Sequence, residues 1–179
     1  MINVSEIKTR KPDHFKTELH EMVYNTLEKL EIPFERVDID EAITMEDCVE
    51  IGKKLDTSIV KTLFLCNRQK SNFYLFVTTD DKPFVTKDFS RALEISRVSF
   101  ATPEMLLDML GTRVGSATAL SCVFDKENKV RIILDKDAVS SEWYGCSDGT
   151  TTGYMKLKTE DLINKYLPFA NHIPTIIEI

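Results

Sequence analysis

The chain has 179 residues, 42% of them hydrophobic and 29% charged, and a formal net charge of −6 at neutral pH. This length fits one domain, and the ordinary globular composition excludes collagen-like, low-complexity and largely disordered chains. No apolar run reaches the ~18–20 residues of a membrane span, and the charged segment 1–12 lacks the apolar stretch of a secretory signal, so we expect one domain over residues 1–179 in the cytoplasm.

A helix and then a strand are predicted for the first forty residues. Apolar side chains at three- and four-residue spacing predict an amphipathic helix over residues 16–30, which Pro33 stops. Residues 34–39 alternate apolar and charged side chains, which is typical of a short, half-buried strand.

A second helix is predicted after Thr44 and Asp47, which resemble a capping box with Asp where Glu or Gln is more usual. This helix should span residues 45–55. Its inward face is expected to hold Met45, Cys48, Ile51 and Leu55.

The apolar, β-rich run 59–66 is typical of a central strand. A polar stretch, 68–72, separates it from a second run, 73–79, so the two predict a hairpin. Next we expect a short helix over 88–93 and a short strand over 97–100.

The remaining segments again mix helices and strands. Thr102, Pro103 and Gly111 predict the start and end of one helix. Later segments predict strands over 121–125 and 130–135 joined as a hairpin, a strand over 154–157, and a helix over 159–167 that ends at Pro168. Frequent hairpins and poor βαβ alternation favour an α+β fold with a mixed, mainly antiparallel sheet.

Cysteine and histidine spacing predicts no metal site and no cofactor. The cysteines at 48, 66, 122 and 146 form no C-x-x-C pair, so reduced thiols in a cytosolic protein are expected. His20 and Glu21 begin like a zincin motif, but Tyr24 stands where the second His is required.

Lys61 is unusual because it lies inside the apolar run 59–66. One interpretation is an ammonium aimed into a pocket, where it holds a phosphate or a polarised carbonyl. The alternative is an edge-strand lysine that points into solvent.

Two loops of small residues are candidates for binding. Loop 111–119 would let backbone N–H groups approach an anion or a carbonyl, although a plain helix-to-strand connection is the alternative. Residues 145–149 match G-x-S-x-G, but the nucleophile elbow needs a following helix and later acid and His partners. A Ser147 hydrolase, a pocket-lining loop and a solvated turn all remain open.

Segments 61–65, 115–120 and 146–152, followed by 157–162, occur in an order and spacing that resembles one family. The chain is similar to the YbaK/ProX-type aminoacyl-tRNA deacylases, also called prolyl-tRNA editing or prolyl-tRNA-synthetase-associated domains, over residues 16–168. The resemblance implies a single α+β domain with a partly barrel-like sheet. It also implies hydrolysis, in trans, of the ester of a mischarged tRNA, most simply Ala-tRNA(Pro).

The resemblance also assigns site residues. Lys61 maps to the pocket lysine, and the loop at Gly115, Ser116 and Ala117 maps to the backbone donors. Asp148 is the carboxylate that would orient a water or the substrate ammonium. The expected substrate-binding residues are Thr62, Ala117, Thr118, Ser147 and Thr151. Ser147 and Asp148 stand where many members have His-Pro, and Thr62 stands where many have Asn.

The implied partners are the aminoacylated 3′ end of tRNA and prolyl-tRNA synthetase. Residues 51–97 carry nine Lys and Arg against five Asp and Glu, so this segment is the expected contact for tRNA phosphates. Its candidate residues are Lys53, Lys54, Arg68, Lys70, Lys82 and Lys87. A non-catalytic relative that binds tRNA or a synthetase is the alternative, because the family histidine is absent.

Overall fold

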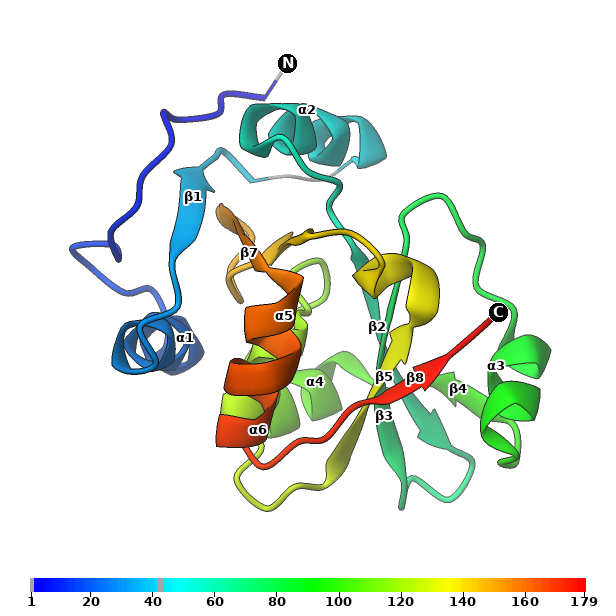
Figure 1. Cartoon of the computed structure of the whole chain (residues 1–179). Coiled ribbons are helices and arrows are strands. Elements are labelled where there is room, and N and C mark those ends of the chain that lie inside the picture. The colour runs from blue at the N-terminus through cyan, green and yellow to red at the C-terminus, as the bar shows by residue number, and fades with distance from the viewer. Residues whose placement is uncertain (1, 42–43) are drawn as a thin grey trace.

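The computed structural model describes residues 2–41 and 44–179 and arranges its strands in two open sheets (Figure 1). One sheet has three strands in the order β1-β7-β6, all antiparallel, and the other has five in the order β4-β2-β3-β5-β8. An isolated parallel bridge between Ile59 and Gly145 joins the two sheets. The fold is therefore α+β with mixed sheets, and neither sheet closes into a barrel.

The strands are β1 (Phe34–Asp38), β2 (Lys61–Asn67), β3 (Phe73–Thr78), β4 (Val98–Phe100), β5 (Val130–Asp135), β6 (Trp143–Ser147), β7 (Gly153–Lys158) and β8 (Thr175–Ile177). The helices are α1 (Glu18–Lys29), α2 (Met45–Leu55), α3 (Thr86–Leu93), α4 (Pro103–Leu110), α5 (Thr159–Asp161) and α6 (Leu167–Phe169). The described residues also form two 3₁₀ turns, η1 (Ala119–Val123) and η2 (Lys136–Val139), and a π turn, η3 (Leu162–Tyr166).

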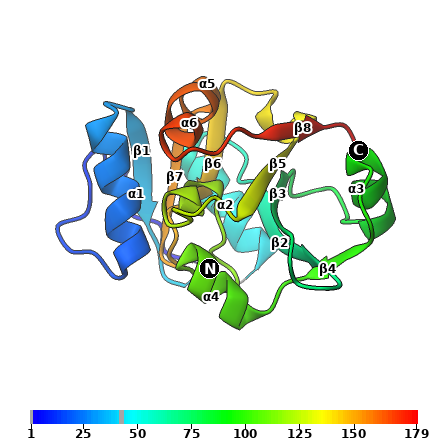
Figure 2. The same ribbon diagram turned by 90° about the horizontal axis from the view of Figure 1, so that it is seen from below.

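Helices cover both faces of the five-stranded sheet, and α1 and α3 lie on opposite sides of the molecule (Figure 2). Leu75 and Val77 of β3 point into the main core with α1, α4 and η3, whereas Tyr74 and Phe76 point to α3. Because side chains alternate along a strand, a sheet covered on both sides needs apolar residues at every position. This requirement accounts for the unbroken apolar runs predicted as strands.

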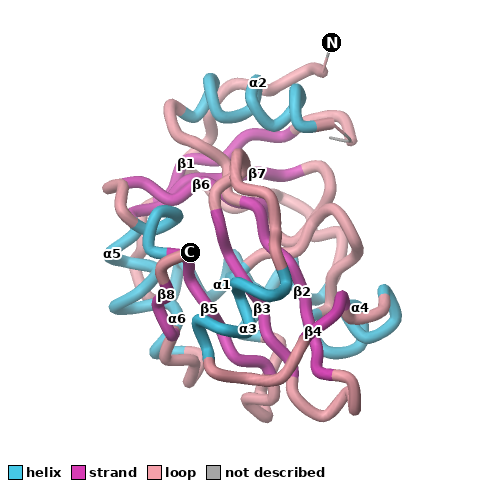
Figure 3. Tube along the Cα trace, turned by 90° about the vertical axis from the view of Figure 1, so that its right-hand side faces the viewer, coloured by secondary structure: helices cyan, strands magenta, loops and turns pink. Residues whose placement is uncertain are grey.

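Helix α2 packs on the other sheet, at the end of the molecule where β2 begins (Figure 3). Its Ile51 and Leu55 are fully buried against Val37 and Tyr154. The predicted capping box is confirmed, because the Thr44 hydroxyl accepts from the Asp47 amide and the Asp47 carboxylate accepts from the Thr44 amide. The predicted inward position of Met45 is wrong, since 67% of this residue is exposed.

The predicted hairpin of strands 121–125 and 130–135 is wrong. Residues Ala119–Val123 form the 3₁₀ turn η1, capped by the Thr118 hydroxyl, and β5 pairs in parallel with β3 and β8. Instead of a β ladder, the Asp125 carboxylate closes the connection by accepting from the Lys129 and Val130 amides. A short, mostly apolar stretch suits a buried turn as well as a strand, so the sequence pattern alone could not separate the two.

Three further features differ from the expectations. The first residues of the expected Gly-rich loop, 145–147, belong to β6, and the short edge strand β8 was not expected. The last helical run continues through Pro168 to Phe169, because the preceding π turn η3 shifts the hydrogen-bond pattern where proline has no N–H to donate. Among the described residues, no helix is long and apolar enough to cross a membrane.

Candidate active site

Lys61, the first residue of β2, lines a cavity of about 270 Å³. The side chain is half-buried, and its ammonium donates a hydrogen bond to the backbone carbonyl of Lys82. We call this space the lysine cavity, and its polar wall consists of Lys61, Thr62, Asp80, Gly115, Ala117 and Ser147. Lys61 therefore lines a cavity, with its ammonium bonded to a backbone carbonyl, and its binding role stays a prediction.

Gly115 and Ala117 bring the small-residue loop to the same cavity. Gly115 has a φ of +96°, in the region that favours glycine, and a Cβ added there would meet no atom within 4 Å. In the described part of the chain, the Gly115 and Ala117 amides have no hydrogen-bond acceptor, whereas the Ser116 amide donates to the Arg113 carbonyl at 3.1 Å. Two of the three predicted backbone donors are thus available to a ligand, and Ser116 is occupied.

Ser147 lines the lysine cavity, but its hydroxyl is committed to the surrounding backbone. The hydroxyl lies 3.2 Å from the Ser116 carbonyl and 3.0 Å from the Thr150 carbonyl, and it accepts from the Gly149 amide at 3.0 Å. A turn into β7 follows Ser147, where a nucleophile elbow has a helix. Ser147 therefore joins the two loops, and its hydroxyl bonds to no basic side chain among the described residues.

Asp148 is buried, and it lines neither the lysine cavity nor the second cavity that lies on the other side of these loops. One oxygen accepts from the Tyr24 hydroxyl at 2.8 Å and contacts His20 Nε2 at 3.1 Å, and the other accepts from the Thr150 amide and hydroxyl at 3.1 and 2.7 Å. Burial, and next the Asp148 charge, raise the pKa of Tyr24 well above its usual value. The carboxylate holds α1 to the second loop and is not directed at a ligand.

Asp80 is a cavity carboxylate that sequence reasoning missed. In the β2–β3 hairpin Lys61 pairs with Thr78, so the residues just after Thr78 lie beside the lysine. The hairpin register was the signal that could have found Asp80. Burial raises the pKa of the nearby Cys48 thiol, and the charge of Asp80 acts in the same direction.

Lys82, which the sequence suggested as a contact for tRNA phosphates, is instead engaged within the protein beside the site. Its ammonium lies 2.9 Å from Asp135 Oδ2, 2.7 Å from Asp137 Oδ2 and 2.6 Å from the Ile179 carbonyl oxygen. Hydrogen bonds that the ammonium donates to Asp137 and Asp135 raise the pKa of Lys82. Because its own backbone carbonyl accepts from Lys61, Lys82 connects the end of β5 to the cavity lysine.

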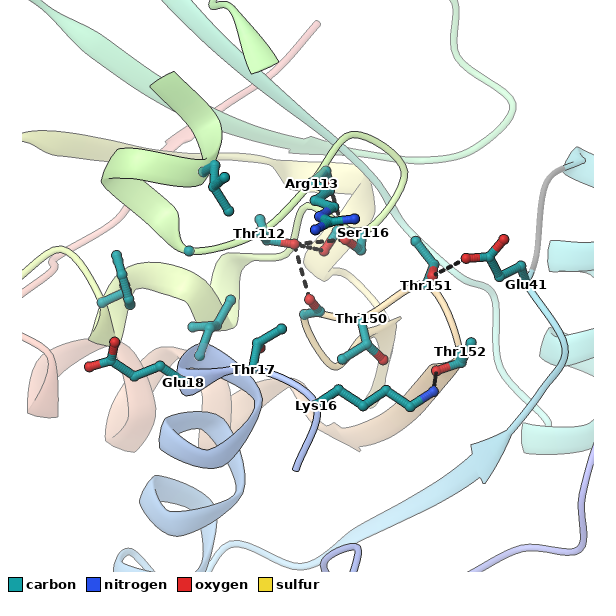
Figure 4. Close-up of a pocket in the computed structure, with 15 residues that line it drawn as sticks. Lys16, Thr17, Glu18, Glu41, Thr112, Arg113, Ser116, Thr150, Thr151 and Thr152 are labelled. Atoms are coloured by element: carbon teal, nitrogen blue, oxygen red, sulfur yellow. Dashed lines mark hydrogen bonds between the residues drawn. The ribbon is translucent and has the colours of Figure 1, made fainter. Parts of the chain in front are cut away.

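A second, larger cavity of about 480 Å³ lies against the same two loops (Figure 4). We call it the threonine cavity, because hydroxyls line it from Thr17, Thr112, Ser116, Thr150, Thr151 and Thr152. Its charged lining residues are Lys16, Glu18, Glu41 and Arg113, and its apolar floor includes Leu19, Leu107 and Phe124. The predicted site residues Ser116 and Thr151 line this cavity and not the lysine cavity.

The partition between the two cavities is built from these loops. Gly115 and Ala117 line one cavity, while Ser116 between them lines the other. Figure 4 shows the Thr112 hydroxyl joining the loops, 2.7 Å from the Ser116 hydroxyl and 3.0 Å from the Gly149 carbonyl. At residues 115–117 a single stretch of backbone therefore contributes side by side to the walls of both cavities.

The other predicted site residues are spread more widely. Thr62 lines the lysine cavity, whereas Thr118 is buried and caps η1. Lys53 and Lys54 lie exposed on α2, whose Met45 and Cys48 line the lysine cavity.

Arg68 and Lys70 lie in the β2–β3 turn, at the end of β2 away from Lys61. At ~3.3 Å per residue, the seven residues of β2 place this turn on the order of 20 Å from the cavity. The structure therefore does not bring these four of the six candidate tRNA-binding residues to one place.

The lysine cavity offers a cation, a carboxylate and unpaired amide donors, but no activated nucleophile. The raised pKa of Cys48 keeps its thiol protonated near neutral pH, and the Ser147 hydroxyl bonds to no basic side chain in the described part of the chain. Among the described residues, no group of three or more His, Cys, Asp or Glu could hold a metal ion. Such an arrangement suits attack by water on an activated acyl group whose oxyanion the amides receive.

Comparison with known proteins gives one consistent result. The family model for the aminoacyl-tRNA editing domain matches residues 40–165, well over half of the chain. A prolyl-tRNA synthetase associated domain-containing protein of Danio rerio is 26% identical over 168 residues, covering 93% of this chain and 88% of that protein. The prolyl-tRNA editing protein ProX of Acetoanaerobium sticklandii is 24% identical over 136 residues, covering 76% and 83%.

A solved structure described as a candidate trans-editing enzyme for prolyl-tRNA synthetase matches with a TM-score of 0.64 and 14% identity. The match covers 91% of this chain and 98% of that one. At this identity the likeness concerns the fold.

Proposed function

The chain belongs to the aminoacyl-tRNA editing domain family, and from this premise we propose that it is a trans-acting hydrolase that deacylates mischarged tRNA, with Ala-tRNA(Pro) as its substrate. The observation that carries the proposal is the convergence of Lys61, Gly115 and Ala117 on one small cavity. Each of these residues lies in a segment that matches the family's order of motifs.

The chemistry requires little more than positioning. An aminoacyl ester is already activated, so a water held against its carbonyl can attack without a covalent enzyme intermediate. The Gly115 and Ala117 amides would donate to the oxyanion of the tetrahedral intermediate. When the intermediate collapses, the bond to the ribose oxygen breaks, a proton passes to that oxygen, and the free amino acid and uncharged tRNA leave.

The two charged groups of the cavity would orient the substrate. We assign the Asp80 carboxylate to the substrate's α-ammonium, in place of the predicted Asp148, whose oxygens are engaged inside the protein. The Lys61 ammonium, held by the Lys82 carbonyl, would stabilise the negative charge that develops on the ester.

Selectivity for alanine would follow from the size of the cavity. Met45, Ile59 and Tyr154 border the polar groups and limit the room for a side chain. A site that simply fits extra methylenes discriminates only ~10–200-fold, whereas a space too small for the proline ring rejects it sterically. Exclusion of proline would protect correctly charged tRNA.

The proposal is tested by giving the purified protein Ala-tRNA(Pro), Cys-tRNA(Pro) and a mischarged Ser-tRNA and measuring release of the amino acid. We expect Ala-tRNA(Pro) to be hydrolysed fastest, and Lys61→Ala to lower kcat about tenfold or more, since it removes a charge from the reacting centre. Lys70→Ala, an exposed lysine at the far end of β2, is the matched control and should retain full activity. No release from any of the three tRNAs would end the proposal.

A second candidate function is a non-catalytic relative that binds tRNA or prolyl-tRNA synthetase. Ser147 and Asp148 stand where many members of the family have His-Pro, and the Asp148 carboxylate is engaged in internal hydrogen bonds. In that case tRNA would bind with a strong dependence on salt but without turnover, and Lys61→Ala would leave any residual rate unchanged.

A further inference from the structure

The peptide group that joins Ser116 to Ala117 lies at the boundary between the two cavities. Its N–H belongs to Ala117, which lines the lysine cavity, and its carbonyl belongs to Ser116, which lines the threonine cavity. The proposed hydrolysis uses this N–H as an oxyanion donor, but it does not say what fixes the direction of the N–H bond. A donor to an oxyanion is effective when it is held in place before the charge develops, so its support belongs to the site.

Two side-chain hydroxyls converge on the carbonyl of this peptide group. The Thr112 hydroxyl and the Ser147 hydroxyl each lie 3.2 Å from the Ser116 carbonyl oxygen, and each is placed to donate to it. All three residues are buried. Thr112 follows α4 and Ser147 ends β6, so two separate parts of the fold hold one carbonyl.

The geometry of the peptide bond converts this grip into a direction for the N–H. The bond between Ser116 and Ala117 is trans, as is every peptide bond in the described residues, so its C=O and N–H point in opposite directions in one plane. Because the carbonyl faces the two hydroxyls, the Ala117 N–H points away from them. It meets no acceptor in the described part of the chain, so a ligand in the lysine cavity can accept from it.

The two hydroxyls share this task, because each has one proton and more than one acceptor within reach. The Ser147 hydroxyl also lies 3.0 Å from the Thr150 carbonyl. The Thr112 hydroxyl lies 2.7 Å from the Ser116 hydroxyl and 3.0 Å from the Gly149 carbonyl. When one hydroxyl donates elsewhere, the other can still donate to the Ser116 carbonyl. The loss of one should therefore cost far less than the loss of both.

We propose that Thr112 and Ser147 are positioning residues, which fix the Ser116–Ala117 peptide group and so aim the Ala117 amide at the ester carbonyl in the lysine cavity. The proposal rests on the proposed function for the identity of the ester. Neither hydroxyl touches the substrate. Ser147, which the sequence suggested as a substrate-binding residue, acts through the backbone instead.

The first experiment measures hydrolysis of Ala-tRNA(Pro) by variants that lack one or both hydroxyls. Thr112→Val and Ser147→Ala should each lower kcat about twofold to threefold, and the double variant about thirtyfold or more, because loss of one oxyanion donor costs ~10²–10³-fold. KM should stay nearly unchanged, since the oxyanion forms only during the reaction. Thr112→Ser keeps the hydroxyl and should retain most of the rate. A double variant that loses no more than the product of the single losses would contradict the proposal.

Two buried hydroxyls elsewhere in the fold provide matched controls. Ser121 and Thr159 are buried, and their hydroxyl oxygens have no hydrogen-bond partner among the residues that the structure describes. Ser121→Ala and Thr159→Val make the same chemical changes without affecting the Ser116 carbonyl, so both should keep the wild-type kcat. Losses in these controls equal to those of the double variant would assign the effect to packing and overturn the inference. A thermal unfolding scan checks that every variant is folded.

The second experiment measures the direction of the Ala117 N–H bond without any substrate. Residual dipolar couplings in an aligned sample report how each backbone N–H bond is oriented relative to the rest of the fold. In the wild type the Ala117 coupling should fit the structure together with those of the strands. In Thr112→Val/Ser147→Ala it should depart from this fit, while the strand couplings keep it. An unchanged Ala117 coupling in the double variant would refute the inference, whatever the rate. Because no tRNA is needed, a failure of the hydrolysis assay remains a separate result.

Discussion

The two cavities share a partition but differ in how their polar groups are satisfied. In the lysine cavity the Gly115 and Ala117 amides have no acceptor among the described residues. In the threonine cavity the hydroxyls are already paired. The Thr112 hydroxyl bonds to the Ser116 hydroxyl and to the Gly149 carbonyl, and the Thr150 hydroxyl donates to Asp148. The Gly115 and Ala117 amides are reached by solvent, so a ligand can replace water at them, whereas the paired hydroxyl network keeps its bonds when the cavity is empty.

This difference separates two tasks. Groups kept unpaired and aimed at a small space are suited to charge that appears during a reaction. Groups that are paired with one another are suited to holding a shape that a ligand enters. The Asp148 network supports the threonine side of the partition and the Lys82 ion pairs support the lysine side, so each cavity can be perturbed separately.

The largest expected effect comes from disturbing the buried Asp148 carboxylate, whose hydrogen bonds hold the 148–152 turn against α1. A Cβ at Gly153 would collide with the carboxylate of Asp148, so Gly153→Ala must displace this buried group from Tyr24 and His20. We expect a loss of about 3–5 kcal/mol in the free energy of unfolding, because breaking a buried, hydrogen-bonded pair costs this much. Urea unfolding measures it.

Gly115→Ala is the matched control for Gly153→Ala. Its Cβ would meet no atom within 4 Å, so only the strain of a positive φ remains, at about 1–3 kcal/mol. It should nevertheless lower hydrolysis, since Gly115 lines the lysine cavity and the strain of a positive φ would shift its amide. Equal stability losses in the two variants would contradict the assignment of Asp148 to the partition.

The next effect concerns Lys82, which we predict to be a positioning residue for Lys61. Lys82→Met removes the ion pairs to Asp135 and Asp137 that fix the carbonyl bonded to Lys61. We expect kcat to fall about fivefold with KM nearly unchanged, since only alignment at the reacting centre is lost. Lys82→Arg, which keeps the charge, should restore most of the rate.

A double-mutant cycle tells positioning from general damage. If Lys82 acts through Lys61, Lys82→Met should cost no further activity in a Lys61→Ala background. Fivefold losses in both backgrounds would mean that Lys82 supports the fold and not the lysine.

Low pH should weaken the ion pair between Asp135 and Lys82. Burial opposes the charge of Asp135, but hydrogen bonds from Thr78 and Lys82 outweigh it and hold the pKa of this carboxyl below its usual value. Its folded-state pKa is therefore below the unfolded value of about 3.9, so its contribution to stability is complete above that pH and is lost as pH falls through the folded pKa. Urea unfolding between pH 6 and about 3 should show a smaller acid loss in Asp135→Asn than in the wild type. Parallel curves would refute the assignment.

The sequence was sufficient where local chemistry determines the outcome. Capping residues placed α2, an ammonium within an apolar strand identified Lys61, and small residues identified the Gly115 loop. It was insufficient where tertiary geometry decides. Whether Gly115 or Ser116 faces a given cavity depends on loop conformation, and Asp80 becomes visible only through the register that pairs Lys61 with Thr78.

Asp148 shows the same limit for polar residues. Its position in a loop of Gly, Ser and Thr favours a ligand-binding role, yet its partners Tyr24 and His20 come from α1, more than a hundred residues earlier in the chain. No local pattern records such a long-range contact. The β6 strand was missed for a related reason. Gly145 is required by the close approach of the Ser58 carbonyl, which would lie 2.6 Å from a Cβ at this position, and not by a turn.

The smallest expected effect asks along which surface RNA reaches the lysine cavity. Lys53 and Lys54 lie on α2, beside the lysine cavity, whereas Arg68 and Lys70 lie at the far end of β2. Each phosphate contact that is removed should lower the slope of log affinity against log salt by about 0.7–0.9. The double variant Lys53→Ala/Lys54→Ala should therefore reduce the slope by about 1–2 and raise KM severalfold.

The double variant Arg68→Ala/Lys70→Ala removes the same charge and serves as the control. Because its positions lie on the order of 20 Å from the cavity, we expect the salt slope and KM to stay unchanged. Lys53 is already paired with Glu50 at 3.0 Å, so Lys54 should account for most of the α2 effect, which the two single variants resolve. If the hairpin variant weakened binding as much as the α2 variant, the RNA would have to extend along the whole length of β2, and the footprint would not be centred on the lysine cavity.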